Sequence, residues 1–237
     1  MKIEIWSDVA CPWCFVGKRR FEEALTRFAH QDQVEVTWRS FELDPNAPRH
    51  RPGPYVERLA GKYGMAVDQA QAMVDNMVSV GRGEGIEFDF EHAQPGNTFD
   101  AHRLLHLAEE RGLQNELKGR LMTANFSEGV AVGDPDALAA VATEVGLDAD
   151  EVRSVLDSDR YEAEVRADER RAASLGIDAV PFFVFDGKYG VAGAQSSDIF
   201  LQILNDVWER SAPAPVPAAA GDDGPAAACE GDACAVA

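Results

Sequence analysis

The segment Cys11-Pro12-Trp13-Cys14 constrains the fold of this chain more than any other. It follows an alternating apolar run at residues 2–6, which predicts a strand, and it opens a pattern with helical periodicity. Two cysteines three positions apart at a helix start lie on one side of the helix, close enough to form a disulfide. Pro12 suits the first helical turn, where a missing N–H costs nothing, and Trp13 adds an apolar surface beside the sulfur atoms. Cysteines so spaced between a strand and a helix indicate working thiols.

Cys11 would lie at the N-terminus of that helix, where unpaired N–H groups and the helix dipole stabilise a thiolate. Such placement lowers a thiol pKa from about 8.5 into roughly the 3.5–7.5 range, and the thiolate is the form that attacks a disulfide. Asp8 lies three residues before Cys11, and a carboxylate close to the sulfur would raise the pKa of Cys11. We expect Asp8 to cap a backbone N–H instead. The pattern favours thiol–disulfide exchange over half of a zinc site, because zinc needs four ligands and Cys229 and Cys234 form the only other cysteine pair.

Composition and charge argue against several classes of partner. The 237 residues are 46% apolar and 27% charged, as in ordinary globular proteins, and the net charge of -19 argues against nucleic acid or an anionic membrane as a partner. No apolar run of about 18 residues predicts a membrane span. The first predicted strand starts at Lys2, without the apolar segment of a signal peptide, so we expect a cytoplasmic protein. Disulfides are rare in that compartment and are usually transient and catalytic.

The order of predicted elements indicates an α/β fold interrupted by helices. Residues 1–46 form a strand, a helix and a second strand at 34–43, which together predict a βαβ unit with a parallel sheet. Residues 47–176 are almost wholly helical. Residues 177–210 form a ββα unit, with Asp186-Gly187 as its hairpin turn. The simplest assembly is one sheet built from both ends, with a helical domain inserted between the two halves.

Periodicity and capping residues divide the helical region further. Phe21, Leu25 and Phe28 would form the buried face of the first helix, with the charged residues at 18–20 and 22–23 on its exposed face. We expect Met73 and Met77 in the core and a short extended piece at 86–90. The predicted helices of the insertion are 55–63, 68–80, 98–111, 116–126, 135–145, 148–156 and 161–175.

The composition changes at residue 211. Proline alternates with small residues up to 217, as in a semi-rigid linker, and the remaining Ala, Gly and Asp predict a disordered tail over 211–237. This tail nevertheless carries Cys229 and Cys234. About 18 residues separate these two cysteines from the folded part, and such a segment can reach tens of ångströms when extended. Our hypothesis is a second redox pair on a flexible arm that visits Cys11.

Four segments stand out together: WSDVACPWCFVG (6–17), NTFDAHRL (97–104), VPFF (180–183) and VAGAQ (191–195). They resemble the DsbA-like FrnE family of disulfide oxidoreductases, which belongs to the thioredoxin superfamily. The resemblance covers about residues 1–210 in the same order and implies a thioredoxin fold with an inserted helical domain. It also implies that Cys11 attacks and Cys14 resolves, and the tail cysteines resemble an extra pair in some FrnE proteins.

The same resemblance implies substrate-binding residues around the cysteines. The Val180–Pro181 bond is expected to be cis and to face the pair, so that the backbone of Val180 receives an extended substrate. We expect Pro12 and Trp13 to contact substrate as well, and Asn97 and His102 to line the cleft between the two parts of the fold.

His102 and His106 have ligand spacing on one helix. A polar helix face explains them better than a metal site, because no third ligand is apparent nearby in the sequence, and no metal is predicted.

Two other functions stay open at this point. Glutathione-dependent hydroxychromene-carboxylate isomerases and kappa-class glutathione transferases share the fold, but they usually carry serine where this chain has Cys11. A non-catalytic zinc-binding or holdase module would join both cysteine pairs. The predicted partners are proteins with thiols or disulfides, with glutathione as a candidate co-substrate. We expect no organic cofactor, and a monomer or homodimer.

Overall fold

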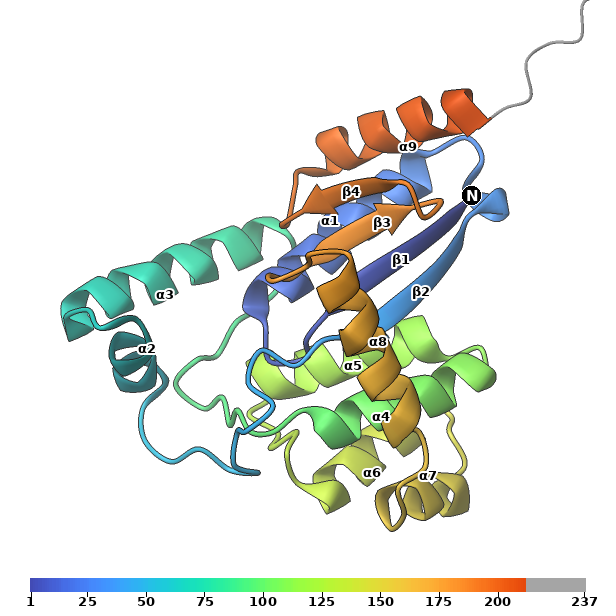
Figure 1. The fold of residues 1–237 in the computed structure, drawn as a ribbon. Coiled ribbons are helices and arrows are strands. Elements are labelled where there is room, and N and C mark those ends of the chain that lie inside the picture. Colours follow the sequence, from blue (N-terminus) through green and yellow to red (C-terminus); the bar gives the residue numbers. More distant parts are fainter. Residues whose placement is uncertain (212–237) are drawn as a thin grey trace, which may run out of the picture.

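The computed structural model describes residues 1–211, and the predicted tail with Cys229 and Cys234 lies outside the described residues. The elements run strand, helix, strand, then a series of helices, and finally strand, strand, helix (Figure 1). This order confirms the α/β thioredoxin-type fold expected from the sequence. No helix within residues 1–211 has both the length and the apolar character needed to cross a membrane.

A four-stranded sheet in the order β2-β1-β3-β4 forms the centre of the fold. β1 pairs in parallel with β2, and the helix α1 (Pro12–Arg27) forms the crossover between them. β3 pairs antiparallel with both β1 and β4. Residues 186–188 connect β3 to β4, and the positive φ angles of Asp186 (48°) and Gly187 (67°) allow this tight turn. The strands are β1 (Lys2–Ser7), β2 (Glu35–Ser40), β3 (Phe182–Phe185) and β4 (Tyr189–Ala192).

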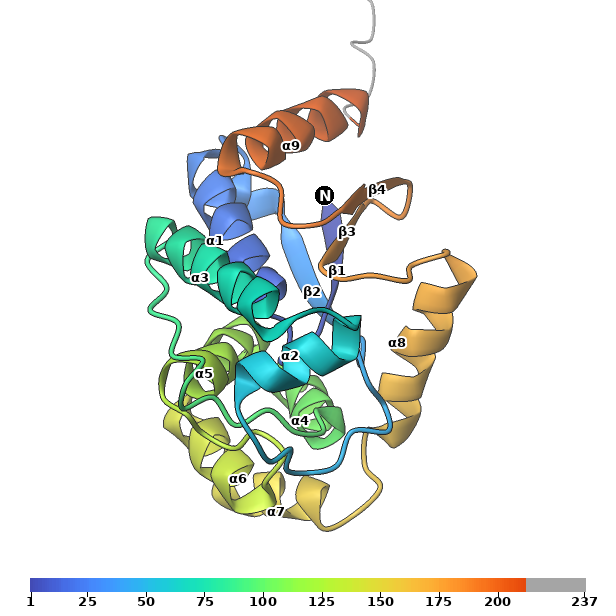
Figure 2. The same ribbon diagram turned by 90° about the vertical axis from the view of Figure 1, so that its left-hand side faces the viewer.

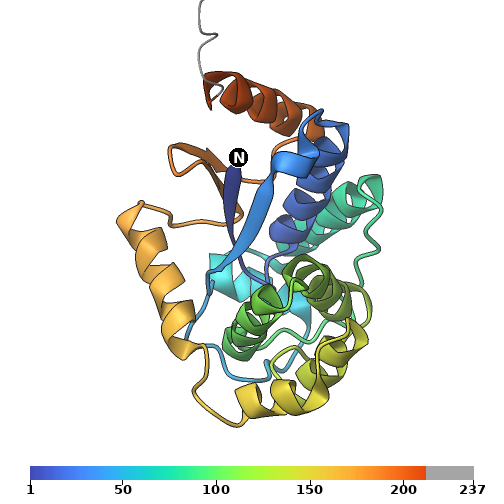
Figure 3. The same cartoon turned by 90° about the vertical axis from the view of Figure 1, so that its right-hand side faces the viewer.

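Different helices cover the two faces of the sheet. α1 (Pro12–Arg27) and α9 (Ser197–Ser211) pack on one face, and α8 (Glu162–Ser174) covers the other (Figure 3). Under α1, the rings of Phe21, Phe183 and Phe200 meet with centroids between 4.5 and 5.6 Å apart. These aromatic contacts fix α1 against the sheet and so fix the position of Cys11 at its start.

The helices between β2 and β3 form two groups. Helices α4 to α7 enclose a core of their own beyond the end of the sheet, while α2 and α3 form a separate hairpin on one side of the molecule (Figure 2). Val9, from the turn before Cys11, is fully buried in the α4–α7 core. The helices are α2 (Tyr55–Tyr63), α3 (Val67–Gly83), α4 (Phe99–Glu110), α5 (Gln114–Ser127), α6 (Pro135–Glu144) and α7 (Ala149–Leu156), and a short 3₁₀ helix spans Gln31–Gln33.

The division of the chain at residues 46, 176 and 210 into separate domains remains a prediction. Val9 from the βαβ unit lies in the helical core, and α8 packs on the sheet. The two parts are therefore joined by shared packing rather than by a linker alone.

Some sequence-based expectations were wrong because tertiary packing overrode the local pattern. Lys18, predicted on the exposed face of α1, is buried: α5 lies beside α1, and the Lys18 ammonium donates to Glu22 and to Asn115, 2.9 Å away. Met73 lies on the outer side of α3 and is 45% exposed, whereas Met77 is buried as expected.

The piece at 86–90, predicted as extended, contains no strand, and β2 is shorter than the predicted 34–43. Phe88 and Phe90 pack against Phe126, with centroids 5.7 and 6.0 Å away, instead of pairing with the sheet. Apolar side chains at these positions therefore serve the core beside α3 and α5 rather than a strand.

Candidate active site

The two cysteines lie at the first turn of α1, as the sequence predicts. Cys11 is the N-cap residue, with extended backbone (φ -103°, ψ 110°), and its carbonyl oxygen accepts the Cys14 N–H at 3.0 Å. Both cysteines are free thiols. Cys14 is fully buried and Cys11 is 5% exposed, whereas Trp13 is 41% exposed beside them. Of the two cysteines, Cys11 therefore lies nearer the surface.

A cis-proline loop faces the cysteine pair. The Val180–Pro181 peptide bond is cis, which confirms the expectation, and the Cys11 thiol donates to the Val180 carbonyl oxygen at 3.6 Å. The loop also touches α1 directly: a Cβ at Gly17 would lie 3.0 Å from Cγ of Pro181. A glycine at position 17 therefore allows the helix and the cis-proline loop to approach this closely.

Asp8 caps the turn that carries Cys11. Its carboxylate accepts the N–H groups of Ala10 at 3.2 Å and Leu43 at 2.8 Å, which confirms the expected capping role. Burial opposes ionisation of Asp8, but the contact with His102, the Leu43 N–H and the charge of Lys118 outweigh it and lower the pKa of the carboxyl group. Asp8 is therefore a buried negative charge just below the cysteine pair.

The surroundings of Cys11 oppose its ionisation. The hydrogen bond with the Cys14 thiol, burial and the negative charge of Asp8 raise the pKa of the Cys11 thiol well above its ordinary value. The lowering expected from the helix N-terminus is outweighed in this geometry. In the free protein, the thiol form of Cys11 is therefore favoured over the thiolate.

Side chains of the helical insertion hold the turn between β1 and α1 from below. Lys118 on α5 donates to the Ser7 carbonyl oxygen at 3.1 Å, and Asn125, two turns further, donates to the Val9 carbonyl oxygen at 3.3 Å. Both side chains are buried. Neither residue is predicted as a site residue from the sequence, although a signal exists: each is a polar residue on the face of α5 that also carries Leu121 and Met122.

His102 on α4 completes this support, with Nε2 3.4 Å from the Asp8 carboxylate. It is completely buried, and burial lowers its pKa despite the nearby carboxylate. The expectation that His102 and His106 lie on a polar helix face is wrong, because both are buried between α4 and other elements. That His102 also contacts substrate stays a prediction.

Asn97, also predicted to bind substrate, uses its side chain to join two backbone segments. Its amide nitrogen donates to the Pro45 carbonyl oxygen at 3.3 Å, and its oxygen accepts the Phe99 N–H at 2.9 Å. The structure thus places Asn97 at the start of α4 beside the loop after β2, and its contact with substrate remains a prediction.

An apolar layer from α2, α3 and the 86–90 segment encloses the cysteines. Cys11 and Cys14 belong to one buried cluster with Phe15, Met77 and Phe126, and Tyr55 packs against that cluster. Burial and the nearby Cys11 raise the pKa of the Tyr55 hydroxyl to about 12. The Cys11 sulfur is therefore reached past side chains of α2 rather than from open solvent.

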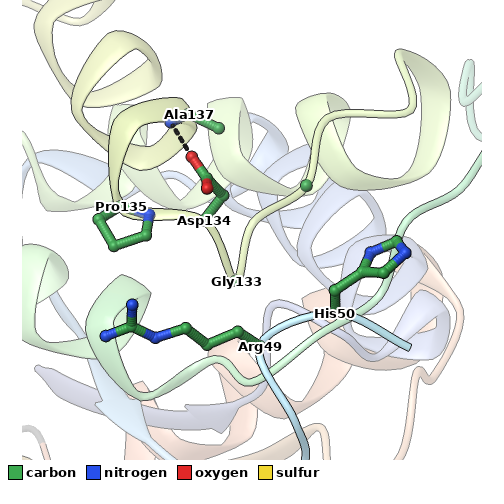
Figure 4. A pocket seen from close by; sticks show the side chains of 7 residues that line it. Arg49, His50, Gly133, Asp134, Pro135 and Ala137 are labelled. Carbon is green, nitrogen blue, oxygen red and sulfur yellow. Dashed lines mark hydrogen bonds between the residues drawn. The ribbon is translucent and has the colours of Figure 1, made fainter. Parts of the chain in front are cut away.

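Two surface cavities lie elsewhere on the described part of the chain. One, of about 290 Å³, is lined by Arg49, His50 and Gly133 at the start of α6, where Asp134 accepts the N–H of Ala137 (Figure 4). The other, of about 410 Å³, lies along β1 and β2. Neither is lined by a predicted site residue. No group of three or more His, Cys, Asp or Glu side chains within residues 1–211 is arranged to hold a metal ion.

The fold and the site define a protein of the thioredoxin superfamily, with Cys-x-x-Cys at the N-terminus of its first helix opposite a cis-proline. Residues 2–205 match the family described as the DSBA-like thioredoxin domain, and the chain belongs to this family. It is 33% identical over 212 residues to the uncharacterized protein YwbO of Bacillus subtilis, covering 88% of this chain and 98% of that protein.

Solved structures show the same relationship. A probable DsbA oxidoreductase from Streptomyces coelicolor is 47% identical and superposes with a TM-score of 0.86, covering 100% of this chain and 99% of that one. The cytosolic disulfide reductase DsbM from Pseudomonas aeruginosa has a TM-score of 0.62 at 16% identity, covering 89% and 100% of the two chains. The similarity to DsbM concerns the fold alone.

Proposed function

We propose that this chain is a thiol–disulfide oxidoreductase or isomerase of the FrnE type that acts on protein substrates through Cys11 and Cys14. The observation that carries the proposal is the position of Cys11: it caps α1, and its sulfur lies 3.6 Å from the carbonyl oxygen of Val180, next to the cis-proline. A substrate strand pairing with the backbone of Val180 would bring its own sulfur to that of Cys11.

The exchange needs two sulfur displacements. The Cys11 thiolate attacks one sulfur of a substrate disulfide; a Cys11–substrate disulfide forms, and the other substrate sulfur leaves as a thiolate. The Cys14 thiolate then attacks the Cys11 sulfur, the Cys11–Cys14 disulfide forms, and the second substrate sulfur leaves as a thiolate. The substrate gains two electrons and the enzyme loses two. The reverse sequence oxidises a substrate dithiol.

Turnover of a scrambled-disulfide protein in a glutathione buffer tests the proposal. The wild type should restore the native disulfides, and Cys11→Ser should restore none. A wild-type protein without activity would contradict the proposal, as would full activity in Cys11→Ser. The variant Cys229→Ser/Cys234→Ser tests the accompanying proposal that the tail pair exchanges with Cys11, through a change in rate under glutathione cycling.

A second candidate function is exchange with small thiols such as glutathione. The burial of Cys11 beneath α2 favours it, because a small thiol needs a narrower approach than a folded protein. The Pseudomonas protein DsbM of similar fold has also been solved with glutathione. Saturable glutathione binding with activity that survives Cys14→Ser would favour this function over protein exchange. In either case we propose that the chain works in the cytoplasm, as a monomer or homodimer.

A further inference from the structure

Lys118 is a buried cation that no ion pair explains. Its side chain is 1% exposed, and its ammonium group donates to the Ser7 carbonyl oxygen at 3.1 Å. Within residues 1–211, no carboxylate oxygen lies within 4 Å of it. A buried ammonium without a paired carboxylate is costly, which points to a role beyond packing.

Lys18 offers a comparison within the same layer of the protein. It is 4% exposed, and its ammonium group lies 5.5 Å from the Trp38 ring, just as that of Lys118 lies 5.7 Å from the same ring. Lys18, however, is paired with Glu22 and hydrogen-bonded to Asn115. Of these two buried lysines, only Lys118 lacks a carboxylate partner among the described residues.

The charges that face Lys118 belong to the redox site. Burial lowers the pKa of its ammonium group to about 8, while the nearby Cys14, Asp8 and Cys11 raise it, so the group is largely protonated at pH 7. Lys18 and His102 are the other titratable groups close by. Met122, one turn further along α5, lies in the same buried cluster as Cys11 and Cys14. Helix α5 thus presents Lys118 to the cysteine pair.

We propose that Lys118 is a positioning residue for the second half of the exchange: its ammonium group stabilises the Cys14 thiolate. This inference rests on the proposed roles of Cys11 and Cys14. The Cys14 proton leaves to solvent, the Cys14 thiolate attacks the Cys11 sulfur of the mixed disulfide, and the substrate sulfur departs with the bonding electrons. Without the buried positive charge, the thiolate form of Cys14 is rarer and resolution slows.

The test uses the full chain with Cys229→Ser/Cys234→Ser, so that only the active pair reacts with 5,5′-dithiobis(2-nitrobenzoate). Attack by Cys11 releases one nitrothiobenzoate and resolution by Cys14 releases a second, which stopped-flow absorbance separates into two phases. In Lys118→Gln, which retains a donor for Ser7 without the charge, the second phase should slow by about tenfold at pH 7. Its pH midpoint should rise by about one unit, equivalent to that fold-change.

Matched variants separate charge from packing. Lys118→Arg retains the charge and should keep a second phase faster than that of Lys118→Gln, and Lys18→Met should leave the second phase unchanged. A folded Lys118→Gln with a wild-type second phase would overturn the proposal, as would equal slowing in Lys18→Met. If Lys118→Gln does not fold, Lys118→Met, which also removes the charge, takes its place under the same criteria. The two phases are measurable even if the chain proves inactive on scrambled proteins.

Discussion

His102 and His106 lie one helical turn apart on α4 and both are buried, and yet their pKa values shift in opposite directions. Burial lowers the pKa of His102, because the single carboxylate of Asp8 does not outweigh it and Lys118 adds a positive charge. Burial acts on His106 too, but Asp168 and Glu109 together raise its pKa to about 9. The number of carboxylates around each ring therefore decides which imidazole is charged at neutral pH.

The regions around the two histidine rings also differ in how completely their polar groups are paired. Near His106, Asp168 accepts the Ser40 N–H at 2.9 Å and pairs with Arg39, so that α8, α4 and β2 are tied together by complete ion pairs. Below the cysteines, by contrast, Ser7 Oγ and His102 Nδ1 are buried without a hydrogen-bond partner among the described residues. The ion pairs around His106 therefore stabilise the fold, whereas the region below the cysteines contains buried polar groups without partners, next to the proposed site of chemistry.

Removing the shared carboxylate should produce the largest effect on stability. Asp168→Ala leaves His106 with Glu109 alone as counter-charge, Arg39 with Glu4 alone, and the Ser40 N–H without a partner, so the free energy of unfolding should fall by roughly 3–5 kcal/mol. Urea denaturation measures this loss. The remaining folded protein should keep wild-type exchange activity, and a loss below about 1 kcal/mol would show that the network is not a stabilising one.

The pH dependence of stability should separate the two histidines. Because the folded-state pKa of His106 is raised to about 9 from 6.5, its stabilisation is complete below pH 6.5 and is lost as the pH rises to 9. The shift corresponds to about 3 kcal/mol. His102, with a lowered pKa, contributes in the opposite sense, above pH 6.5, and loses that contribution as the pH falls.

Denaturation curves between pH 6 and 9.5 for the wild type, His106→Gln and His102→Gln check this prediction. The alkaline decline should be weaker in His106→Gln and should persist in His102→Gln. An unchanged decline in His106→Gln would mean that the charge on His106 does not stabilise the fold.

A smaller effect is expected at the site itself. The hydrogen bond with Cys14 and burial raise the pKa of Cys11 most, and the Asp8 charge adds to them. Asp8→Asn removes that charge, so alkylation of Cys11 by iodoacetamide at pH 7 should become about twofold faster. Peptide mass spectrometry distinguishes Cys11 from the other cysteines. Asp134→Asn, at a helix cap that also accepts two backbone N–H groups, is the matched control and should leave the rate unchanged. Equal rates in Asp8→Asn and the wild type would contradict the electrostatic role of Asp8.

The sequence predicted the parts of this molecule that depend on local pattern. The Cys11–Cys14 helix start, the parallel βαβ unit, the Asp186-Gly187 turn and the Asp134 cap all follow from residue spacing and backbone preference, and the structure contains each of them. The cis bond before Pro181 followed from the family resemblance rather than from the proline itself.

What the sequence did not predict depends on contacts between distant segments. A carboxylate one turn away accompanies Lys18 and His106 in the sequence, but each of the four side chains also contacts a residue more than 50 positions away, and those contacts are not visible in the sequence. Burial of a charged side chain follows from which helix docks beside it, and that is decided by the assembled fold. The contacts of Lys118 and His102 with the turn before Cys11 could therefore be recognised only from the structure.

The central claim is that Cys11 attacks and Cys14 resolves, and trapping the covalent intermediate tests it most directly. Cys14→Ser, incubated with a disulfide-containing protein and then quenched with acid, should accumulate a mixed disulfide that peptide mass spectrometry locates on Cys11. Cys11→Ser should give no adduct on Cys14. An adduct on Cys14 in Cys11→Ser, or none on Cys11 in Cys14→Ser, would contradict the account.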